Sequence, residues 1–160
     1  MPSKCFEDFR RGERWTAPFH RVTNEEIIAF ARLSGDRNPL HLDAEYAKAT
    51  PFKRPIAHGL LGLSLASGML DRLGIVRKTV VAFIGLEWRF VAPIYPGDRV
   101  RLKLSVSRKS RTGRSDRGIV EFDAALVNHK SGKKEATVQE GRWKLLIRRR
   151  GGSSEGERER

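Results

Sequence analysis

A change of hydrophobic period near Gly74 constrains the fold of this 160-residue chain more than any other feature. In residues 58–73 apolar side chains fall on every side of a helix, mixed with Gly, Ala and Ser, which predicts a buried helix. After Gly74 the period becomes that of strands, which we expect over residues 80–91, 99–109, 117–128 and 135–149. Short turns connect these strands, and consecutive strands on short turns form an antiparallel sheet. The pattern therefore predicts an α+β fold in which the sheet wraps around the helix.

Shorter elements precede the buried helix. Residues 15–20 are typical of a short strand or an extended lead-in. Thr23 and Glu26 form a capping box that predicts the start of a helix running to about Ser34. A second short helix is expected over residues 44–49. We expect residues 1–150 to form one domain and residues 151–160, which are polar and of low complexity, to form a disordered tail.

Composition favours a soluble intracellular protein. Mean hydropathy is −0.50, and no apolar run approaches the roughly 20 residues that a membrane span requires. The first residues lack the apolar core of a signal peptide. A single cysteine, Cys5, excludes an intramolecular disulfide and fits a reducing compartment. We therefore expect a cytoplasmic location and no membrane partner.

The segment after the first predicted helix contains two groups that transfer protons. Gly35 suits the position that ends a helix, whereas Pro39 disfavours a helix through its own position and pushes Asn38 toward an extended conformation. A turn between Asp36 and His41 lets a carboxylate and an imidazole converge, as general acid–base chemistry requires. A plainer interpretation stays open, in which Asp36 and Asn38 only form a turn and His41 is an ordinary half-buried histidine.

The residues around this segment resemble the signature of the (R)-specific enoyl-CoA hydratases, the MaoC-like dehydratases of the hotdog-fold superfamily. The matching residues are Phe30, Ser34-Gly35-Asp36, Asn38-Pro39-Leu40-His41 and Ala47. A second block, from Phe52 to Gly59, looks like the family's segment leading into its central helix. The resemblance covers most of the chain and implies a single hotdog domain, an antiparallel sheet around a buried central helix. It also implies a homodimer with the acyl pocket close to the subunit interface.

The resemblance further implies a lyase that reversibly adds water to a 2-enoyl-CoA, giving the (3R)-hydroxyacyl-CoA. It places the catalytic dyad at Asp36 and His41, without settling which of them takes the proton from water. It also implies that the Gly59 amide donates to the thioester oxygen, where an enolate develops. Backbone N–H groups at a helix N-terminus are suited to this task. A plainer interpretation, in which Gly59 only allows a tight start of the helix, stays open but is less favoured.

Three more residues are candidates for the substrate site. Asn38 would orient the loop and has a weaker claim to substrate contact. His58 fits a structural role better than a catalytic one, and Ser67, two turns along the central helix, is a candidate to hydrogen-bond the dyad. The four histidines and Cys5 show no metal-ligand spacing, so we expect no metal and no cofactor beyond the thioester substrate itself.

The charge balance is strongly basic. The chain has 32 Lys and Arg against 19 Asp and Glu, a net charge of +13. The basic residues concentrate between positions 99 and 117: Arg99, Arg101, Lys103, Arg108, Lys109, Arg111, Arg114 and Arg117. No nucleic-acid-binding motif or interleaved aromatic accompanies them, which makes nucleic acid an unfavoured partner. A solvated basic face, or attraction of the phosphates of an acyl-CoA or acyl-carrier-protein substrate, explains the excess as well.

Two other functions remain open. A hotdog thioesterase would ordinarily need an acidic residue on the central helix, and no Asp or Glu lies between His58 and Leu70. A non-enzymatic module that binds acyl thioesters would have no use for an intact Asp36–His41 pair. The sequence does not indicate the acyl chain length or whether the carrier is coenzyme A or an acyl carrier protein.

Overall fold

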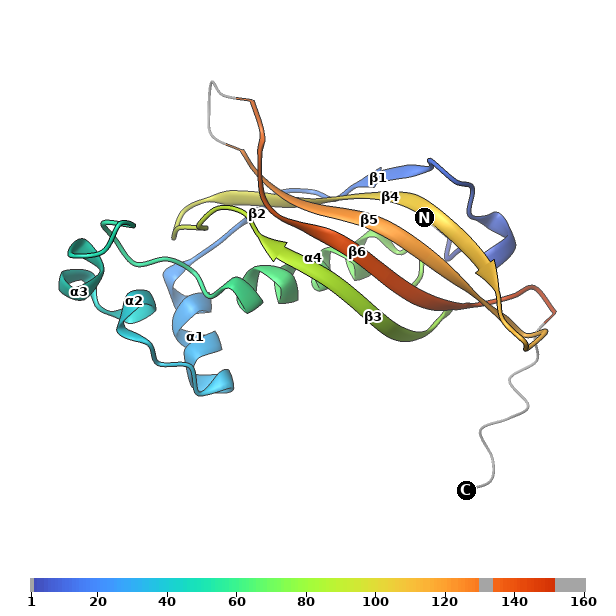
Figure 1. Cartoon of the computed structure of the whole chain (residues 1–160), viewed down its shortest axis with the longest axis horizontal. Coiled ribbons are helices and arrows are strands. Elements are labelled where there is room, and N and C mark those ends of the chain that lie inside the picture. The colour runs from blue at the N-terminus through green and yellow to red at the C-terminus, as the bar shows by residue number, and fades with distance from the viewer. Residues whose placement is uncertain (1, 130–133, 152–160) are drawn as a thin grey trace.

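A six-stranded antiparallel sheet curves over one long helix, which lies against its concave face (Figure 1). The computed structural model describes residues 2–129 and 134–151, so the tail predicted over residues 151–160 lies outside the described part except for Gly151. The long helix is α4 (Gly59–Leu73), and the four long strands are β3 (Val80–Phe90), β4 (Arg99–Arg111), β5 (Arg117–His129) and β6 (Ala136–Arg148). The predicted α+β class, the four strands and the helix beneath them are confirmed.

The sheet has the order β1-β4-β5-β6-β3, and β2 also pairs with β4. The two short strands β1 (Arg14–Thr16) and β2 (His20–Arg21) occupy the predicted lead-in and add to one edge. The other edge is β3, which follows α4 in the chain and pairs with β6. This order leaves β3 without a neighbour on its outer side among the described residues.

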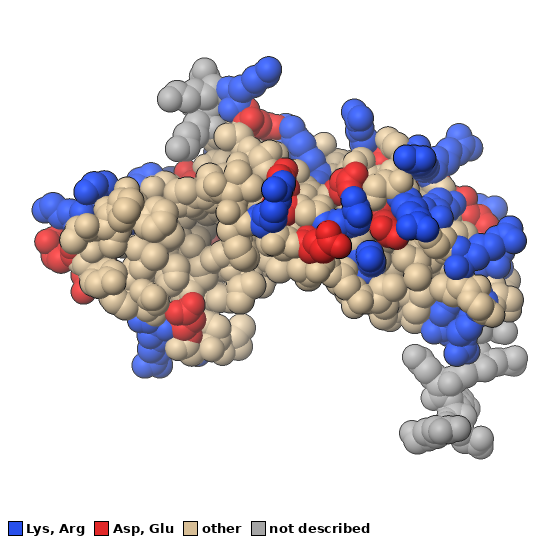
Figure 2. Space-filling model, viewed as in Figure 1, with Lys and Arg blue, Asp and Glu red and all other residues tan. Residues whose placement is uncertain are grey.

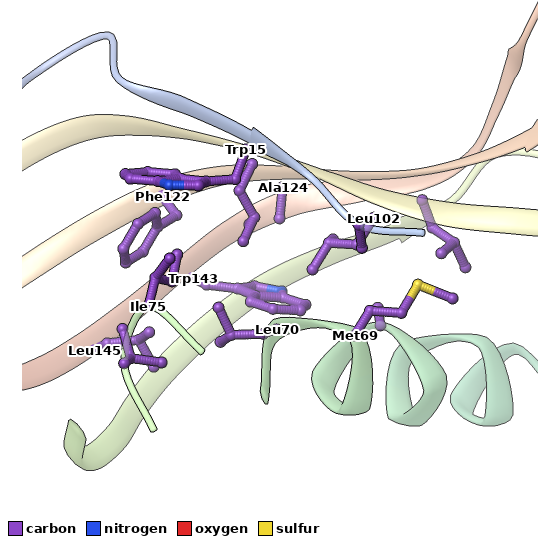
Figure 3. Close-up of a cluster of buried hydrophobic side chains, with 14 of the residues drawn as sticks. Trp15, Met69, Leu70, Ile75, Leu102, Phe122, Ala124, Trp143 and Leu145 are labelled. Carbon is purple, nitrogen blue, oxygen red and sulfur yellow. The ribbon is translucent and has the colours of Figure 1, made fainter. Parts of the chain in front are cut away.

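The core lies between α4 and the concave face of the sheet (Figure 3). Trp143, Phe122 and Met69 are completely buried there, and Phe122 makes an edge-to-face contact with Trp15, with ring centroids 6.3 Å apart. Alternate residues of β4 are buried, as expected for strands with one face on a core. Burial of these large side chains is the main favourable contribution to folding.

One face of α4 is open in the single chain, so the prediction of a helix buried on every side is wrong for the monomer. Leu61, Ala66 and Met69 face the sheet and are buried, whereas Leu60 is 59% exposed and Ser64 is also exposed. The sheet covers only one side of the helix, and no described segment covers the other. Apolar residues on that side therefore lie at the surface of the isolated chain.

Three short α-helices precede α4 in the chain. The capping box of Thr23 and Glu26 starts α1 (Asn24–Ser34) as predicted, and α3 (Ala44–Lys48) also lies where it was expected. A four-residue helix, α2 (Pro39–Leu42), was not predicted. Pro39 was expected to prevent a helix through its position; instead it begins one, because the N–H that proline lacks has no partner at the first helical position.

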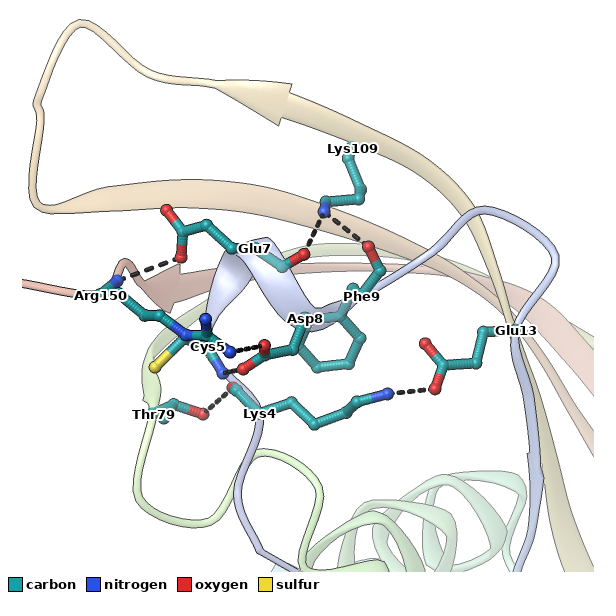
Figure 4. Close-up of polar contacts among 9 residues, drawn as sticks. All are labelled: Lys4, Cys5, Glu7, Asp8, Phe9, Glu13, Thr79, Lys109 and Arg150. Carbon is teal, nitrogen blue, oxygen red and sulfur yellow. Dashed lines mark hydrogen bonds and ion pairs between the residues drawn. The ribbon is translucent and has the colours of Figure 1, made fainter.

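The two ends of the described chain are joined by polar contacts (Figure 4). The short 3₁₀-helix η1 (Phe6–Asp8), also unpredicted, lies near the end of β6. Arg149 Nε donates to Glu7 at 2.8 Å and the Arg150 amide donates to the same carboxylate at 3.0 Å. Burial alone would raise the pKa of Glu7, but these bonds outweigh it and lower the pKa to about 2.

Half of the eight basic residues at positions 99–117 form ion pairs inside the described part of the chain. Arg101 and Lys103 form ion pairs with Glu135, Arg114 and Arg117 with Asp116. Figure 2 shows basic and acidic side chains next to one another over the strands. Within the described residues, no helix is both long and apolar enough to span a bilayer.

Candidate functional site

The end of α1 and the start of α2 fix the loop that carries Asp36. Gly35 ends α1 with a left-handed backbone (φ 78°), a conformation that glycine adopts without cost. The Ser34 hydroxyl then accepts from the Asp36 amide at 3.2 Å, and Asp36 Oδ1 accepts from the Asn38 amide at 3.2 Å. Asn38 Oδ1 accepts from the Leu40 amide at 2.9 Å and so caps α2. Asn38 thus orients the loop, as the first of its two predicted roles requires.

His41 is held in one orientation by the segment before α4. Its Nδ1 lies 2.8 Å from the Ile56 carbonyl oxygen. Because a carbonyl only accepts, Nδ1 carries the proton of the neutral ring and Nε2 has a free lone pair. A half-buried imidazole with this tautomer can accept a proton from water at Nε2.

His58 is in contact with both Asp36 and His41. Its side chain is only 2% exposed, its Nε2 donates to the Asp36 carbonyl at 2.9 Å, and its ring lies against the His41 ring with centroids 3.8 Å apart. Phe30 packs on the same imidazole at 5.1 Å. Burial lowers the pKa of His58, and the nearby His41 adds to that effect, whereas the Asp36 carbonyl and carboxylate oppose it. His58 is therefore a neutral, structural histidine at neutral pH.

The donor atoms of Asp36, His41 and His58 lie within 4.8 Å of one another. Such spacing occurs in metal sites, but one nitrogen of each imidazole is already bonded to a carbonyl. The two imidazole rings are stacked on each other, with centroids 3.8 Å apart and planes inclined at 32°. The arrangement suits a carboxylate–imidazole pair on a supporting ring better than a metal centre.

A cavity of about 400 Å³ brings His41 together with the start of α4. Its lining residues are His41, Phe52, Ile56, Ala57, Gly59, Leu60, Phe90, Val91, Ala92, Pro93, Ile94 and Gln139. Among the residues that the structure describes, no side chain caps the N-terminus of α4, which begins at Gly59, so the first amides of the helix are left for another acceptor. The Phe90 ring lies against Gly59, where an added Cβ would be 2.8 Å from Phe90 Cδ1. The free amide and the imidazole thus meet in one largely apolar space.

Ser67 is not brought to this site in the single chain. It lies on the exposed side of α4, eight residues or roughly 12 Å of helix beyond Gly59. Among the described residues it has no hydrogen bond to Asp36 or His41. Its predicted contact with the dyad stays a prediction.

Gln139 and Phe90 also line the cavity, and sequence reasoning missed both. A signal for Gln139 was present, since it shares the parity of Trp143, Leu145 and Ile147 and is therefore polar on an apolar strand face. Phe90 had no such signal, because an aromatic residue at the end of a strand is usually part of a core.

Comparison with known proteins identifies the family of this domain. The MaoC like domain family matches residues 11–127. Over 82 residues the chain is 42% identical to the (R)-specific enoyl-CoA hydratase of Aeromonas caviae, a stretch that makes up 51% of this chain and 60% of that enzyme. The chain matches 32%, 60% and 54% of the lengths of three curated relatives.

Solved structures show the same architecture. The monoamine oxidase regulatory protein of Archaeoglobus fulgius is 32% identical, with a TM-score of 0.84 over 93% of this chain and 97% of that chain. A Mycobacterium tuberculosis protein with a double hotdog fold, 20% identical, has a TM-score of 0.77 over 96% of this chain and 47% of that chain. The fold is thus the predicted hotdog. Since the family match covers well over half of the 160 residues, the chain belongs to the family of MaoC-like domains.

Proposed function

We propose that this protein is a lyase that reversibly adds water to a 2-enoyl-CoA to form the (3R)-hydroxyacyl-CoA. The observation that carries the proposal is the shared cavity, in which the His41 imidazole and the uncapped N-terminus of α4 at Gly59 lie together. A base and an oxyanion donor on one small apolar space are what hydration of an enoyl thioester needs. Relatives named (R)-specific enoyl-CoA hydratase and 3-hydroxybutyryl-CoA dehydratase support the same reaction class.

In the proposed mechanism Asp36 and His41 hold one water between them. One member of the pair takes one proton of the water as the oxygen attacks C3 of the enoyl group, while the other accepts a hydrogen bond from the second O–H, whose proton stays on the new hydroxyl. Negative charge moves to the thioester oxygen, where the Gly59 amide donates and the positive end of the α4 dipole adds to the stabilisation. A proton returned from the same pair to C2 completes the addition, so both new bonds form on one face of the double bond.

A thioesterase is the strongest rival function. The one acidic residue of α4 is Asp71, which lies in the last turn, beyond the stretch from His58 to Leu70. Asp71 is exposed and receives two hydrogen bonds from the Arg77 guanidinium, at 3.0 and 2.7 Å. A carboxylate occupied in this way at the far end of the helix cannot assist at the cavity near Gly59.

One assay separates the two functions. We expect the purified chain to consume the conjugated double bond of a 2-enoyl-CoA, followed by loss of enoyl absorbance, with no release of free thiol. Chiral analysis of the product should give the (3R) alcohol. Thiol release from a saturated acyl-CoA without any hydration would replace this proposal by the thioesterase, and binding without either reaction would leave the acyl-thioester-binding module.

A further inference from the structure

A buried amide, Gln139, forms part of the cavity wall. Gln139 lies on the concave face of β6 and is 2% exposed, yet it lines the same cavity as His41 and Gly59. Its Nε2 donates to the Gly59 carbonyl at 3.0 Å, and its Oε1 accepts from Trp88 Nε1 at 3.0 Å. Two hydrogen bonds to different elements fix this side chain between the first turn of α4 and the sheet.

Two glycines leave room for the Gln139 side chain and its hydrogen bonds. An added Cβ at Gly62 would lie 2.8 Å from Gln139 Cδ, so a larger residue on α4 would displace the amide. An added Cβ at Gly141 would lie 2.9 Å from Trp88 Cε3, in the path of the indole that reaches Gln139. The helix and the strand therefore approach the Gln139 side chain on both sides with no room for further atoms.

The core next to Trp88, the hydrogen-bond partner of Gln139, is closely packed. The Trp143 ring lies 5.5 Å from the Trp88 ring and is completely buried, and Met69 and Leu70 of α4 fill the space beneath it (Figure 3). A chain entering past Gly59 would meet the Gln139 amide and then these residues. The cavity of about 400 Å³ lies near the small end of the range for ligand pockets.

We propose that Gln139 is a specificity-determining residue, the end wall that restricts this enzyme to short acyl groups such as butenoyl. This inference rests on the proposed hydration and adds the substrate class. An acyl chain long enough to reach Gln139 would have to break its bonds to Gly59 and Trp88. That would leave buried polar groups without partners, at a cost that longer chains do not recover.

The test is the ratio of kcat/KM for decenoyl-CoA to that for butenoyl-CoA in the full chain. The wild type should prefer butenoyl-CoA, and Gln139→Ala should raise the ratio about tenfold or more, the size of effect that small changes in pocket space produce. Gln139→Met, which keeps the length of the side chain but not its two hydrogen bonds, is the matched comparison and should raise the ratio less than Gln139→Ala does. Gln139→Val, which suits a strand, replaces the alanine variant if that one does not fold.

Equal turnover of both substrates by the wild type, or an unchanged ratio in folded Gln139→Ala and Gln139→Val, would overturn the inference while the hydratase function stands. Binding of the saturated butyryl-CoA and decanoyl-CoA, measured by calorimetry, separates the two claims. A preference for butyryl-CoA that disappears in Gln139→Ala supports the end wall even if no enoyl thioester is hydrated. In that case only the proposed function fails.

Discussion

His58 links the three groups that the proposed reaction uses. Its ring supports His41, its Nε2 holds the Asp36 carbonyl, and its backbone precedes Gly59 at the start of α4. Its Nδ1 is buried and has no hydrogen-bond partner among the described residues. A proton on this ring would therefore be poorly solvated and would lie beside a second imidazole, and both effects disfavour the charged form.

We predict that acid destabilises the protein through His58. Because burial lowers the pKa of His58 in the folded state, the unfolded chain binds a proton more readily below the ordinary pKa of about 6.5. Stability should be full above that pH and should fall as the pH drops below it. Urea unfolding at pH 7.5 and 5.5 should show a smaller loss for His58→Gln than for the wild type. The control His129→Gln should keep the wild-type loss, and an equal loss in all three proteins would contradict this account.

Sequence reasoning could indicate the candidate residues of the site but not the contacts that support them. Gly35, Asp36 and His41 are close in the chain, so turn propensities and the family resemblance were enough to bring them together. The His41–His58 ring contact and the Gln139–Gly59 bond join segments 17 and 80 residues apart. Such contacts depend on how the sheet lies on α4, which local patterns do not contain.

At the scale of elements, the link between η1 and the end of β6 has a testable contribution to stability. The Glu7 carboxylate is about one-third exposed, so its bonds to Arg149 and Arg150 are partly screened by water. Glu7→Gln should lower the free energy of unfolding by about 0.5–1 kcal/mol at pH 7. Because its pKa is lowered to about 2 in the fold, the difference should be present above about pH 4.5 and disappear as the pH approaches 2.

Asp123→Asn is the matched control for this change. Asp123 forms a more exposed ion pair, 3.6 Å from Arg142 on the outer face of the sheet, and its replacement should have little effect. Thermal unfolding of both variants across this pH range measures the difference. A Glu7→Gln effect that persists at pH 2 would show that the lost stability comes from packing rather than from charge.

Long periodic elements were predictable, and short ones were not. The four long strands and α4 were located to within a few residues because each repeats its pattern several times. The helix α2 has only four residues, and its capping residue, Asn38, is of a type that is equally common in turns. The hydrophobic period of the sequence also could not show that α4 has one open face, because that depends on which other segments cover the helix.

At the scale of the whole molecule, the open face of α4 and the free edge of β3 indicate that a second copy covers them. The strand and the residue after it expose apolar side chains: Val80, Val81, Phe83, Ile84, Leu86, Phe90 and Val91. A long apolar edge strand is a liability that proteins normally cover. We therefore propose a homodimer in which β3 of each copy lies at the interface.

Light scattering at micromolar concentration should give the mass of a dimer for the wild type. Ile84→Lys, which places a charge on a 46% exposed position of β3, should shift the protein toward monomer. Leu33→Lys changes an exposed leucine at the end of α1 and should leave the dimer intact. A stable wild-type monomer would contradict the proposed interface.

The basic excess should affect substrate capture through residues at the cavity. Lys53 and Arg54 are exposed and follow Phe52, which lines the cavity, and Arg54 packs over Tyr95 at 4.0 Å. If they attract coenzyme A phosphates, kcat/KM for a CoA thioester should fall as salt rises, because the Debye length is only ~8 Å at physiological ionic strength. A short uncharged thioester should show little salt dependence.

The variant Lys53→Asn tests this directly, because asparagine tolerates the left-handed backbone of Lys53 (φ 64°). It should weaken the salt dependence, whereas Arg108→Gln, at a distant exposed position of β4, should not. Retention of nucleic acid at physiological salt with a steep salt slope would instead favour the binding role that the sequence disfavoured.

The central claim is that Asp36 and His41 act as one unit on the water that attacks the enoyl group. The most direct measurement is kcat for hydration of butenoyl-CoA by Asp36→Asn, His41→Ala and the double variant, with circular dichroism to verify the fold. Each single change should lower kcat by about 10²–10⁴-fold, and the double variant should fall little further, because residues that act together do not contribute additively. Near-wild-type turnover by either folded single variant would contradict the account.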